Sequence, residues 1–372
     1  STQGVSSAAS DVYKRQHIIL ADRKTLKCPN GIVLGTPGSG KSFFAKREMA
    51  NAFFATNDHI LILDPENEYT ALTEQLHGQT IYLAPDSHSY LNPMDLDLST
   101  DVGESPMLMQ ADFLLSQCEL MMASYGNPLM PIEKSLIDRC ISLVYRDYLK
   151  NPRPENMPVL GDLYQCLREQ HNSRADDLAT AMEIYVTGSL SYLNHRTNVD
   201  LNNRMVCYNT SKLGQGLKKL VMSNVQKHIW QRTAVNRYAG ITTRIFLDEF
   251  HLLLKEPQTA AYTAEIYKRF RKWNGIPTSL TQNVKDLLDS SEIENILENS
   301  DFVLMLNQGA SDRNILAQRL GISPQELSHV TNSSEGEGLL FFGDKIIPFE
   351  DKFPRDTQLY RVMTTKPSDL AA

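Results

Sequence analysis

The chain lacks any run of about eighteen or more consecutive apolar residues, the length that a transmembrane helix needs. That absence predicts that no segment spans a membrane, and it favours a cytoplasmic location. Cysteine is scarce: there are five, none in Cys-x-x-Cys spacing, which favours free thiols in a reducing compartment over a metal site or a disulfide framework. An excess of positive charge is also missing, because 37 basic residues face 44 acidic ones and the net charge is −7. DNA is therefore possible as a partner, through a local basic patch or a ring-shaped assembly, but the charge does not indicate it.

What is present is ordinary for a globular protein: 41% hydrophobic and 22% charged residues in a chain of 372. This length suits one large α/β domain with an inserted or appended subdomain. Residues 1–16 are rich in Ser and Ala, and we interpret them as a disordered tail or a remnant of cloning or sequence assembly. The globular pattern begins near His17, close to the first motif, so we expect a further N-terminal domain in the natural protein.

The most informative motif matches G-x-x-x-x-G-K-[ST] at every required position. It consists of Gly35, Thr36, Pro37, Gly38, Ser39, Gly40, Lys41 and Ser42. Glycines let successive backbone N–H groups point at a phosphate chain, the lysine reaches the β- and γ-phosphates, and the Ser42 hydroxyl ligates Mg²⁺. The motif follows a short apolar strand at 32–34 and opens a helix at 42–55, whose positive N-terminus favours phosphate. These residues, with Phe43, form the predicted ATP-binding set.

Two acids follow a second apolar strand about 200 residues downstream. Arg244 to Leu247 forms the strand, and Asp248 and Glu249 come directly after it, as in a Walker B motif. We expect Asp248 to hold Mg²⁺, through Ser42 or a bound water, and Glu249 to polarise the attacking water. The alternative interpretation is a solvated strand end.

Two further candidates follow the ends of other apolar runs. In the segment Asp64-Pro65-Glu66-Asn67-Glu68-Tyr69, Glu66 is a candidate for orienting water, and the alternative is a capped turn with exposed acids. Gln282 follows a strand at 277–280 and is a candidate for contacting the γ-phosphate or the water, and the alternative is a helix cap.

The basic cluster at 268–272 contains candidates for an arginine that would enter the active site of a neighbouring subunit. There it would stabilise the charge that develops during phosphoryl transfer. Arg271 is the first choice and Arg269 the second, with Arg313 and Arg319 as lesser candidates. A solvated helix face is an equally good interpretation of this cluster. The histidines show no metal-ligand spacing such as H-E-x-x-H, and we interpret them as structural or surface residues.

The pattern of apolar runs predicts an α/β fold: a RecA-like P-loop NTPase core with a mostly parallel sheet, an all-α insertion and a C-terminal β-hairpin that turns at Gly343-Asp344. The predicted boundaries are 17–104 and 201–372 for the two parts of the core, and 105–200 for the helical insertion. Asp162 and Ser173 are predicted helix N-caps within that insertion.

One family shares this combination of motifs, and the chain resembles it over residues 17–365. The motifs are the phosphate loop, Asp64-Pro65-Glu66-Asn67-Glu68-Tyr69, Leu91-Asn92-Pro93, Leu247-Asp248-Glu249 and Thr281-Gln282-Asn283. They resemble the motor domain of conjugative-transfer and type IV secretion ATPases of the TraC/TrbE-like group, in the HerA–FtsK branch. The resemblance implies a homo-oligomer, for example a hexamer, with sites at subunit boundaries. It also implies secretion-channel components as partners, and a place at the inner face of the cell membrane reached only through those partners.

The leading functional hypothesis is therefore an ATPase motor that uses ATP and Mg²⁺. A nucleotide-dependent assembly scaffold is the alternative from another class, and it would not need Glu249. A third hypothesis is a DNA translocase of the same branch, for which salt-sensitive DNA binding would be evidence.

Overall fold

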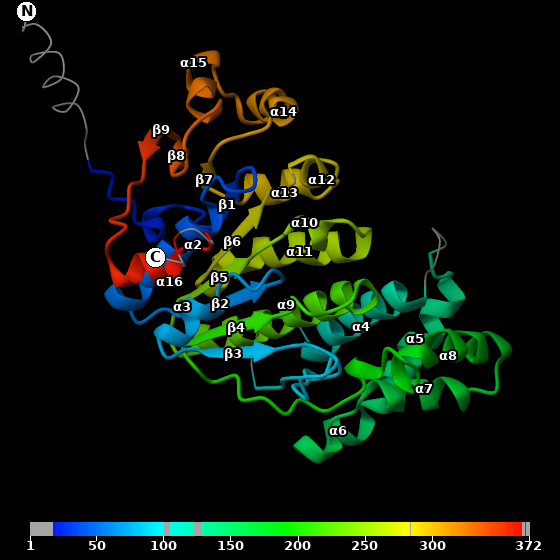
Figure 1. The fold of residues 1–372 in the computed structure, drawn as a ribbon. Helices are drawn as coiled ribbons and strands as arrows, with labels where there is room; N and C mark the ends of the chain where they lie inside the picture. The colour runs from blue at the N-terminus through cyan, green and yellow to red at the C-terminus, as the bar shows by residue number, and fades with distance from the viewer. Residues whose placement is uncertain (1–17, 100–104, 123–127, 283, 367–368, 370–372) are drawn as a thin grey trace, which may run out of the picture.

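The computed structural model describes residues 18–99, 105–122, 128–282, 284–366 and 369. The predicted tail at 1–16 lies outside them. The strands are β1 (Gly31–Leu34), β2 (His59–Asp64), β3 (Gln79–Tyr82), β4 (Met205–Asn209), β5 (Thr243–Leu247), β6 (Gly275–Thr281), β7 (Phe302–Met305), β8 (Glu337–Phe342) and β9 (Lys345–Glu350). They form one nine-stranded sheet in the order β3-β4-β2-β5-β6-β1-β7-β8-β9 (Figure 1).

The sheet is parallel from β3 to β7 and antiparallel at the β7-β8-β9 edge. Strands β1, β4, β5, β6 and β7 are buried along their whole length, as expected for parallel strands with helices on both faces. Strands β8 and β9 form the predicted hairpin. The predicted fold class, a mostly parallel α/β sheet with a C-terminal hairpin, is confirmed.

Helices cover both faces of the sheet (Figure 1). The helices outside the β3–β4 connection are α2 (Lys41–Ala55), α3 (Thr70–Gln75), α9 (Gln215–Tyr238), α10 (His251–Leu254), α11 (Pro257–Phe270), α12 (Val284–Leu288), α13 (Ile293–Glu298), α14 (Ala310–Leu320), α15 (Pro324–Leu327) and α16 (Gln358–Met363). Helices α2, α3 and α16 share one core with Val33, Ile60 and Ile62. Helices α9, α10 and α11 share the other with Leu61 and Leu63.

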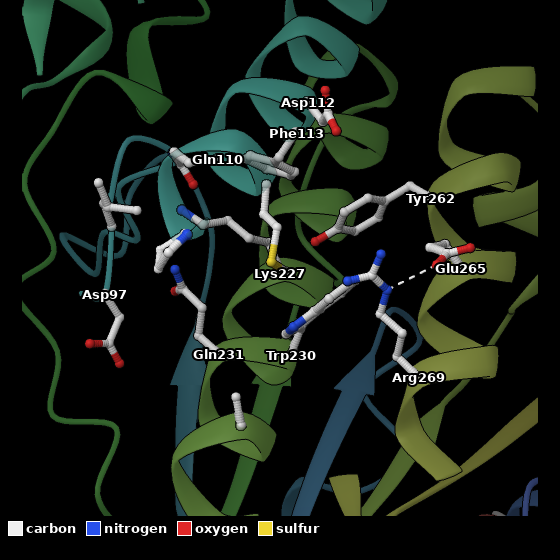
Figure 2. A pocket seen from close by; sticks show the side chains of 14 residues that line it. Asp97, Gln110, Asp112, Phe113, Lys227, Trp230, Gln231, Tyr262, Glu265 and Arg269 are labelled. Carbon is white, nitrogen blue, oxygen red and sulfur yellow. Dashed lines mark hydrogen bonds and ion pairs between the residues drawn. The ribbon is translucent and has the colours of Figure 1, made fainter. Parts of the chain in front are cut away.

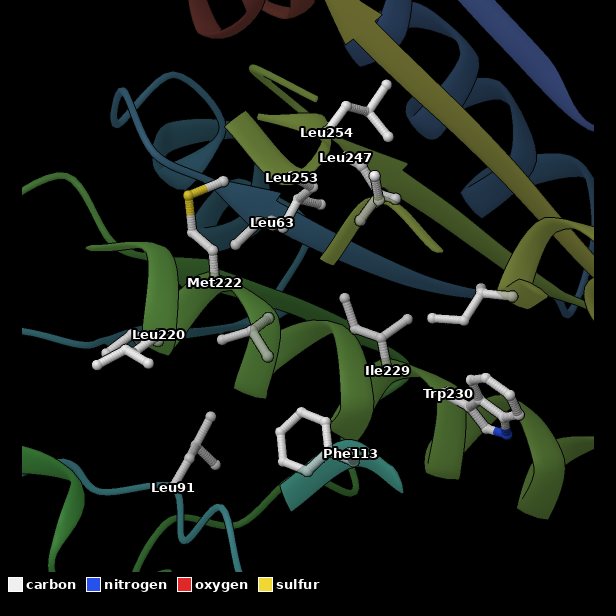
Figure 3. Packing of buried hydrophobic residues seen from close by; sticks show 14 of the residues in the cluster. Leu63, Leu91, Phe113, Leu220, Met222, Ile229, Trp230, Leu247, Leu253 and Leu254 are labelled. Carbon is white, nitrogen blue, oxygen red and sulfur yellow. The ribbon is translucent and has the colours of Figure 1, made fainter. Parts of the chain in front are cut away.

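Helix α9 contributes Leu220, Met222, Ile229 and Trp230 to the buried apolar side chains labelled in Figure 3. Met222 and Ile229 on this helix belong to the core that also includes Leu63 of β2 and Leu247 of β5. All four side chains are at most 1% exposed. At about 25 cal/mol per Å² of buried apolar area, such residues stabilise the fold by roughly 1.5–3 kcal/mol each. This packing fixes the strands from which the candidate site residues emerge.

The described part of the chain between β3 and β4 contains a group of helices joined by irregular segments. It contains α4 (Pro106–Met122), α5 (Pro131–Val144), α6 (Arg146–Lys150), α7 (Leu160–Arg168) and α8 (Ser173–Val186). That residues 105–200 form a separate subdomain stays a prediction. Neither predicted N-cap is correct: Asn172 caps α8 through its side chain, and Asp162 lies inside the first turn of α7, where it accepts from the backbone N–H of Val159. In both cases the helix begins one or more residues earlier than the sequence suggests.

A buried ion network ties α2 to the strands at the amino edge of the sheet. Arg23, 3% exposed, donates to Glu48 of α2 at 2.9 Å and to Thr278 of β6 at 2.6 Å. Glu48 also pairs with Arg244 of β5 at 3.2 Å, and Arg244 pairs with Asp58 at 2.9 Å. Helix α2 is therefore anchored at the edge opposite its own N-terminus. Within the described ranges, no helix combines the length and hydropathy needed to cross a membrane.

Candidate active site

The phosphate loop connects β1 to α2 at the carboxyl edge of the sheet. Gly38 and Gly40 have φ angles of +75° and +100°, in the left-handed region that glycine adopts without strain. A Cβ at Gly35 would lie 2.3 Å from Ser39 Oγ, so the loop is too tight there for a side chain. The Ser39 hydroxyl is buried and has no hydrogen-bond partner among the described residues. The loop thus has the backbone curvature of an anion-binding nest and a polar group that a ligand would satisfy.

Helix α2 begins at Lys41, and its N-cap Gly40 offers no side-chain cap. Lys41 is only 8% exposed, and burial lowers the pKa of its ammonium, an effect that Asp248 and Glu249 oppose. Phe43 points towards the C-terminal segment, where its ring packs against Phe353 and Tyr360 at centroid distances of 5.8 and 5.4 Å. The exposed Pro37 and Gly38 and the half-buried Thr36 and Ser42 complete the loop.

Strand register brings the other candidates to the same edge. Leu247 lies opposite Leu63, so Asp248 and Asp64 emerge side by side from β5 and β2. Thr281 lies opposite Leu34, so Gln282 emerges beside the start of the phosphate loop. Because carboxyl ends of parallel strands meet at one edge, residues some 200 positions apart converge there.

Asp248 and Glu249 are both buried, at 4% and 8% exposed. Burial raises the pKa of Asp248 to about 7, with further contributions from Glu249 and Glu68. Burial also raises the pKa of Glu249, while Lys41 opposes that shift. Glu249 has a φ of +47°, an uncommon left-handed conformation for a residue with a side chain, and its N–H donates to Asp248 Oδ1 at 2.9 Å. Such clustered, shifted carboxyls are typical of functional sites.

The segment after β2 forms a turn around Asp64. Asp64 is fully buried and accepts from the backbone N–H groups of Glu68 and Tyr69 at 2.9 and 3.0 Å. The Glu66 side chain is 55% exposed and pairs with Lys218 at 3.6 Å. Glu66 as a group that orients water stays a prediction.

Two functional candidates near this turn were missed by the sequence reasoning. Glu68 points inward, and its Oε2 is buried without a hydrogen-bond partner among the described residues. Lys46, on α2, is 1% exposed, donates to the Met363 carbonyl at 3.1 Å and lies 5.6 Å from the Tyr69 ring centroid. Burial lowers the pKa of Lys46, and Glu68 opposes this most strongly. The available signal was that Glu68 belongs to the acidic segment Asp64-Pro65-Glu66-Asn67-Glu68-Tyr69 directly after β2.

A third missed residue is His251. It lies two positions beyond Glu249 and is 7% exposed, with its Nδ1 3.2 Å from Glu249 Oε2 and 3.1 Å from Thr281 Oγ1. The interpretation of the histidines as structural or surface residues did not single it out. The signal that could have found it is its short distance in sequence from the two acids.

The arginine candidates lie in different places. Arg271 is exposed in the turn η4 (Arg271–Trp273) just before β6, at the amino edge of the sheet, opposite the phosphate loop. Arg269 packs over the Trp230 ring at 5.4 Å and pairs with Glu265 at 2.9 Å. Arg313 and Arg319 are on α14, which follows the carboxyl end of β7, and Arg319 pairs with Glu294. A role for Arg271 in a neighbour's site stays a prediction.

Gln282 has an exposed side chain at the phosphate-loop edge. Its predicted role as a contact for the γ-phosphate or the water is compatible with that place and stays a prediction. Asn283, the next residue of the motif, lies outside the described residues.

A separate cavity of about 120 Å³ lies between α4, α9 and α11 (Figure 2). Trp230 and Tyr262 stack across it with centroids 5.6 Å apart, and Lys227 lies over Phe113. Burial lowers the pKa of Lys227 to about 7. None of the phosphate-loop or strand-end candidates lines this cavity.

The residues at the phosphate-loop edge fit a Mg²⁺ ion held together with a nucleotide. Magnesium in such sites takes one or two carboxylates, with phosphate and water oxygens completing its shell. The carboxylate of Asp248 and the hydroxyl of Ser42, at the start of α2, are oxygen groups of the kind such a shell uses, and their role as ligands stays a prediction. Among the described residues no group of three or more His, Cys, Asp or Glu side chains could cage an ion alone.

The comparisons with known proteins point to one family and one fold. The family model for the TraG P-loop domain matches residues 17–336. VirB4 of Thermoanaerobacter pseudethanolicus has a similar structure, with a TM-score of 0.80 and 24% identity, covering 92% of this chain and 93% of that one. The bacterial conjugative coupling protein TrwB is similar in its complex with sulphate, with a TM-score of 0.59, 11% identity and coverage of 93% and 92%. The structure of TrwB in complex with ADP and Mg²⁺ has a TM-score of 0.56 and 12% identity. The match covers 89% of this chain and 87% of that one. No curated protein sequence gives a significant match. At these identities the structural likeness is one of fold.

Proposed function

The chain belongs to the TraG P-loop domain family, and from that premise we propose that it is an ATP-hydrolysing motor domain that powers type IV secretion or conjugative transfer. One observation carries the proposal: an intact phosphate loop on β1 shares the carboxyl edge of the sheet with the buried acids Asp248 and Glu249 on β5. This arrangement supports a site in which a phosphate-binding loop acts together with acids that could activate water.

The phosphate loop binds the nucleotide. Backbone N–H groups curled by Gly38 and Gly40 face the phosphates, and the N-terminus of α2 adds its positive dipole. Lys41 neutralises charge on the β- and γ-phosphates, and because it is largely buried, that charge acts in a medium of low dielectric constant. The complex of TrwB with ADP and Mg²⁺ supports ATP and Mg²⁺ as the ligands of this related site.

Ser42 and Asp248 would hold the Mg²⁺. When bound, the ion supplies charge that stabilises the negative oxygens of the transferred phosphoryl group. Asp248 is buried, whereas Ser42 is only half-buried. Glu68, in the turn after β2, lies close enough to Asp248 to contribute to its raised pKa. A buried carboxyl with a raised pKa is poised for a cation, since the cation restores its charged form.

Glu249 is the proposed general base. It accepts a proton from a water molecule whose oxygen attacks the γ-phosphorus, and the bond to the β–γ bridging oxygen breaks to give ADP and phosphate. Its raised pKa moves its basicity towards neutral pH, where general bases work best. Gln282 and Glu66 are proposed to orient the water or the γ-phosphate from the neighbouring strand ends.

A homo-oligomer would complete the site. No arginine of the cluster at 268–272 lies at the phosphate-loop edge of its own subunit, so Arg271 would act only in a neighbour's site. We propose an oligomer, for example a hexamer, with secretion-channel components as partners at the inner face of the cell membrane. The names of VirB4 and of the coupling protein TrwB support this class of machine.

An assembly scaffold that binds ATP without using its hydrolysis is the alternative function. Glu249→Gln separates the two, because a motor loses turnover and function while a scaffold keeps function. We expect Glu249→Gln to bind ATP with wild-type affinity and to release phosphate at least about 100-fold more slowly. Glu155→Gln, at an exposed glutamate between α6 and α7, is the matched control and should behave as wild type. Unchanged turnover in Glu249→Gln would contradict the proposed base.

A further inference from the structure

His251 contacts the carboxylate that the proposed mechanism uses as its base. It opens α10, two residues beyond Glu249, and its ring is buried against β6. Its Nδ1 lies 3.2 Å from Glu249 Oε2 and 3.1 Å from Thr281 Oγ1. One ring nitrogen therefore faces both the Glu249 carboxylate and the hydroxyl at the carboxyl end of β6.

The backbone of Glu249 requires such support. Its φ of +47° is a conformation that a residue with a side chain keeps only where its surroundings hold it. Backbone contacts fix the turn: Glu249 N–H donates to Asp248 Oδ1, and Phe250 N–H donates to the Leu280 carbonyl at 3.0 Å. Those bonds fix the main chain, but they leave the three side-chain torsions of the glutamate free.

We propose that His251 is a positioning residue for Glu249: its single Nδ1–H is shared between the Glu249 carboxylate and the Thr281 hydroxyl oxygen, which lies at the strand end that carries Gln282. The inference rests on the proposed ATPase function. A hydrogen bond to an ionised acceptor is short, directional and stronger than one between neutral groups, so it selects one rotamer of the glutamate. His251 thereby connects the side chain of Glu249, which follows β5, with the side chain of Thr281 at the end of β6.

The electrostatic surroundings agree with a neutral ring that donates from Nδ1. Burial and the nearby Lys255 lower the pKa of His251, while Asp286 opposes this shift. A neutral imidazole carries one N–H, and its tautomer is set by the acceptor it meets. Here the carboxylate is the stronger acceptor of the two groups that face Nδ1.

The test compares His251→Ala, which removes the donor, with His251→Asn, whose side-chain amide places a donor near the position of Nδ1. Phosphate release at saturating ATP, ATP affinity and the unfolding midpoint are measured for each, beside wild type and Glu249→Gln. We expect His251→Ala to lower the turnover rate by at least about tenfold with ATP affinity changed less than about threefold, and His251→Asn to recover most of the rate. His228→Gln is the matched control: this buried histidine bonds to the Asn92 carbonyl at 3.3 Å, away from the site, and its loss should not change turnover.

Three results would overturn the proposal: wild-type or raised turnover in His251→Ala, an equal loss in His251→Asn, or a loss that only follows the unfolding midpoint. A readout independent of turnover covers the case in which wild type itself hydrolyses no ATP and the proposed function fails. In protein labelled with ¹⁵N-histidine, we expect the His251 Nδ1 resonance to be that of a protonated nitrogen and to shift in Glu249→Ala. An unchanged resonance would refute the contact whatever the activity.

Discussion

Replacing Asp248 with asparagine should stabilise the nucleotide-free protein at alkaline pH, although it removes a proposed Mg²⁺ ligand. Burial, followed by the carboxylates of Glu249 and Glu68, raises the pKa of Asp248 from its ordinary value of 3.8 to about 7. A difference of about 3 pKa units corresponds to about 4 kcal/mol at 1.36 kcal/mol per unit. That is the cost of ionising this side chain in the folded protein rather than in the unfolded chain.

The sign of the pH dependence follows from proton binding. Between about pH 4 and pH 7 the folded state holds this proton and the unfolded state does not, so folding stability falls as pH rises through that window. The penalty is absent below about pH 4 and complete above about pH 7, and roughly 2–3 kcal/mol of it develops between pH 5 and pH 8. The asparagine side chain cannot ionise, so the variant should gain that amount relative to wild type between these two pH values.

The assay is denaturant unfolding of wild type and Asp248→Asn at about pH 5 and pH 8, without nucleotide or Mg²⁺. Asp177→Asn, at an exposed position on α8, is the control and should show no pH-dependent difference. If Asp248→Asn loses more stability at pH 8 than at pH 5, the prediction is wrong, because the charge of Asp248 would then stabilise the fold.

Three further predictions concern the same edge of the sheet. Glu68→Gln should slow phosphate release more than Glu66→Gln does, since one oxygen of Glu68 is buried with no hydrogen-bond partner in the described part of the chain and Glu66 is 55% exposed, and equal rates would contradict this. Gly40→Ala should weaken ATP binding by at least about tenfold in calorimetric titration, because its φ is +100° and its Cβ would lie 3.3 Å from Glu335 Cγ. Affinity for Mg²⁺-ATP should fall by up to about tenfold per pH unit below pH 7, because Asp248 must release its proton on binding, and the slope should flatten in Asp248→Asn.

Local patterns predicted most of the fold. The apolar runs at 59–63 and 243–247 are strands because a parallel strand covered on both faces needs an uninterrupted apolar sequence. The hairpin around Gly343 was predicted from two apolar runs on either side of the turn dipeptide Gly343-Asp344. The sheet order, in which β6 lies between β5 and β1, could not be predicted from these patterns, because strand neighbours are chosen by tertiary packing.

The sequence predicted the site residues that belong to motifs with a fixed spacing along the chain. It missed the residues that join the site only through contacts made in the folded structure. The phosphate loop and the pair Asp248-Glu249 have fixed spacings because backbone geometry defines them. Glu68 and His251 have no such signature: the turn around Asp64 directs Glu68 inward, and the left-handed turn at Glu249 brings His251 back to the carboxylate. Both placements depend on the turns that follow neighbouring strands, and those turns come together only when the strands pair in the folded sheet.

A motor built on Glu249 is best tested by phosphate release from ATP and Mg²⁺ as a function of protein concentration, for wild type and Glu249→Gln, with ATP binding followed in parallel. A motor whose site is shared between subunits predicts wild-type specific activity that rises with protein concentration, and a variant that binds ATP but releases phosphate at least about 100-fold more slowly. If both proteins bind ATP and neither releases phosphate at any concentration, or if both release it equally, the chain is not a motor that works through Glu249.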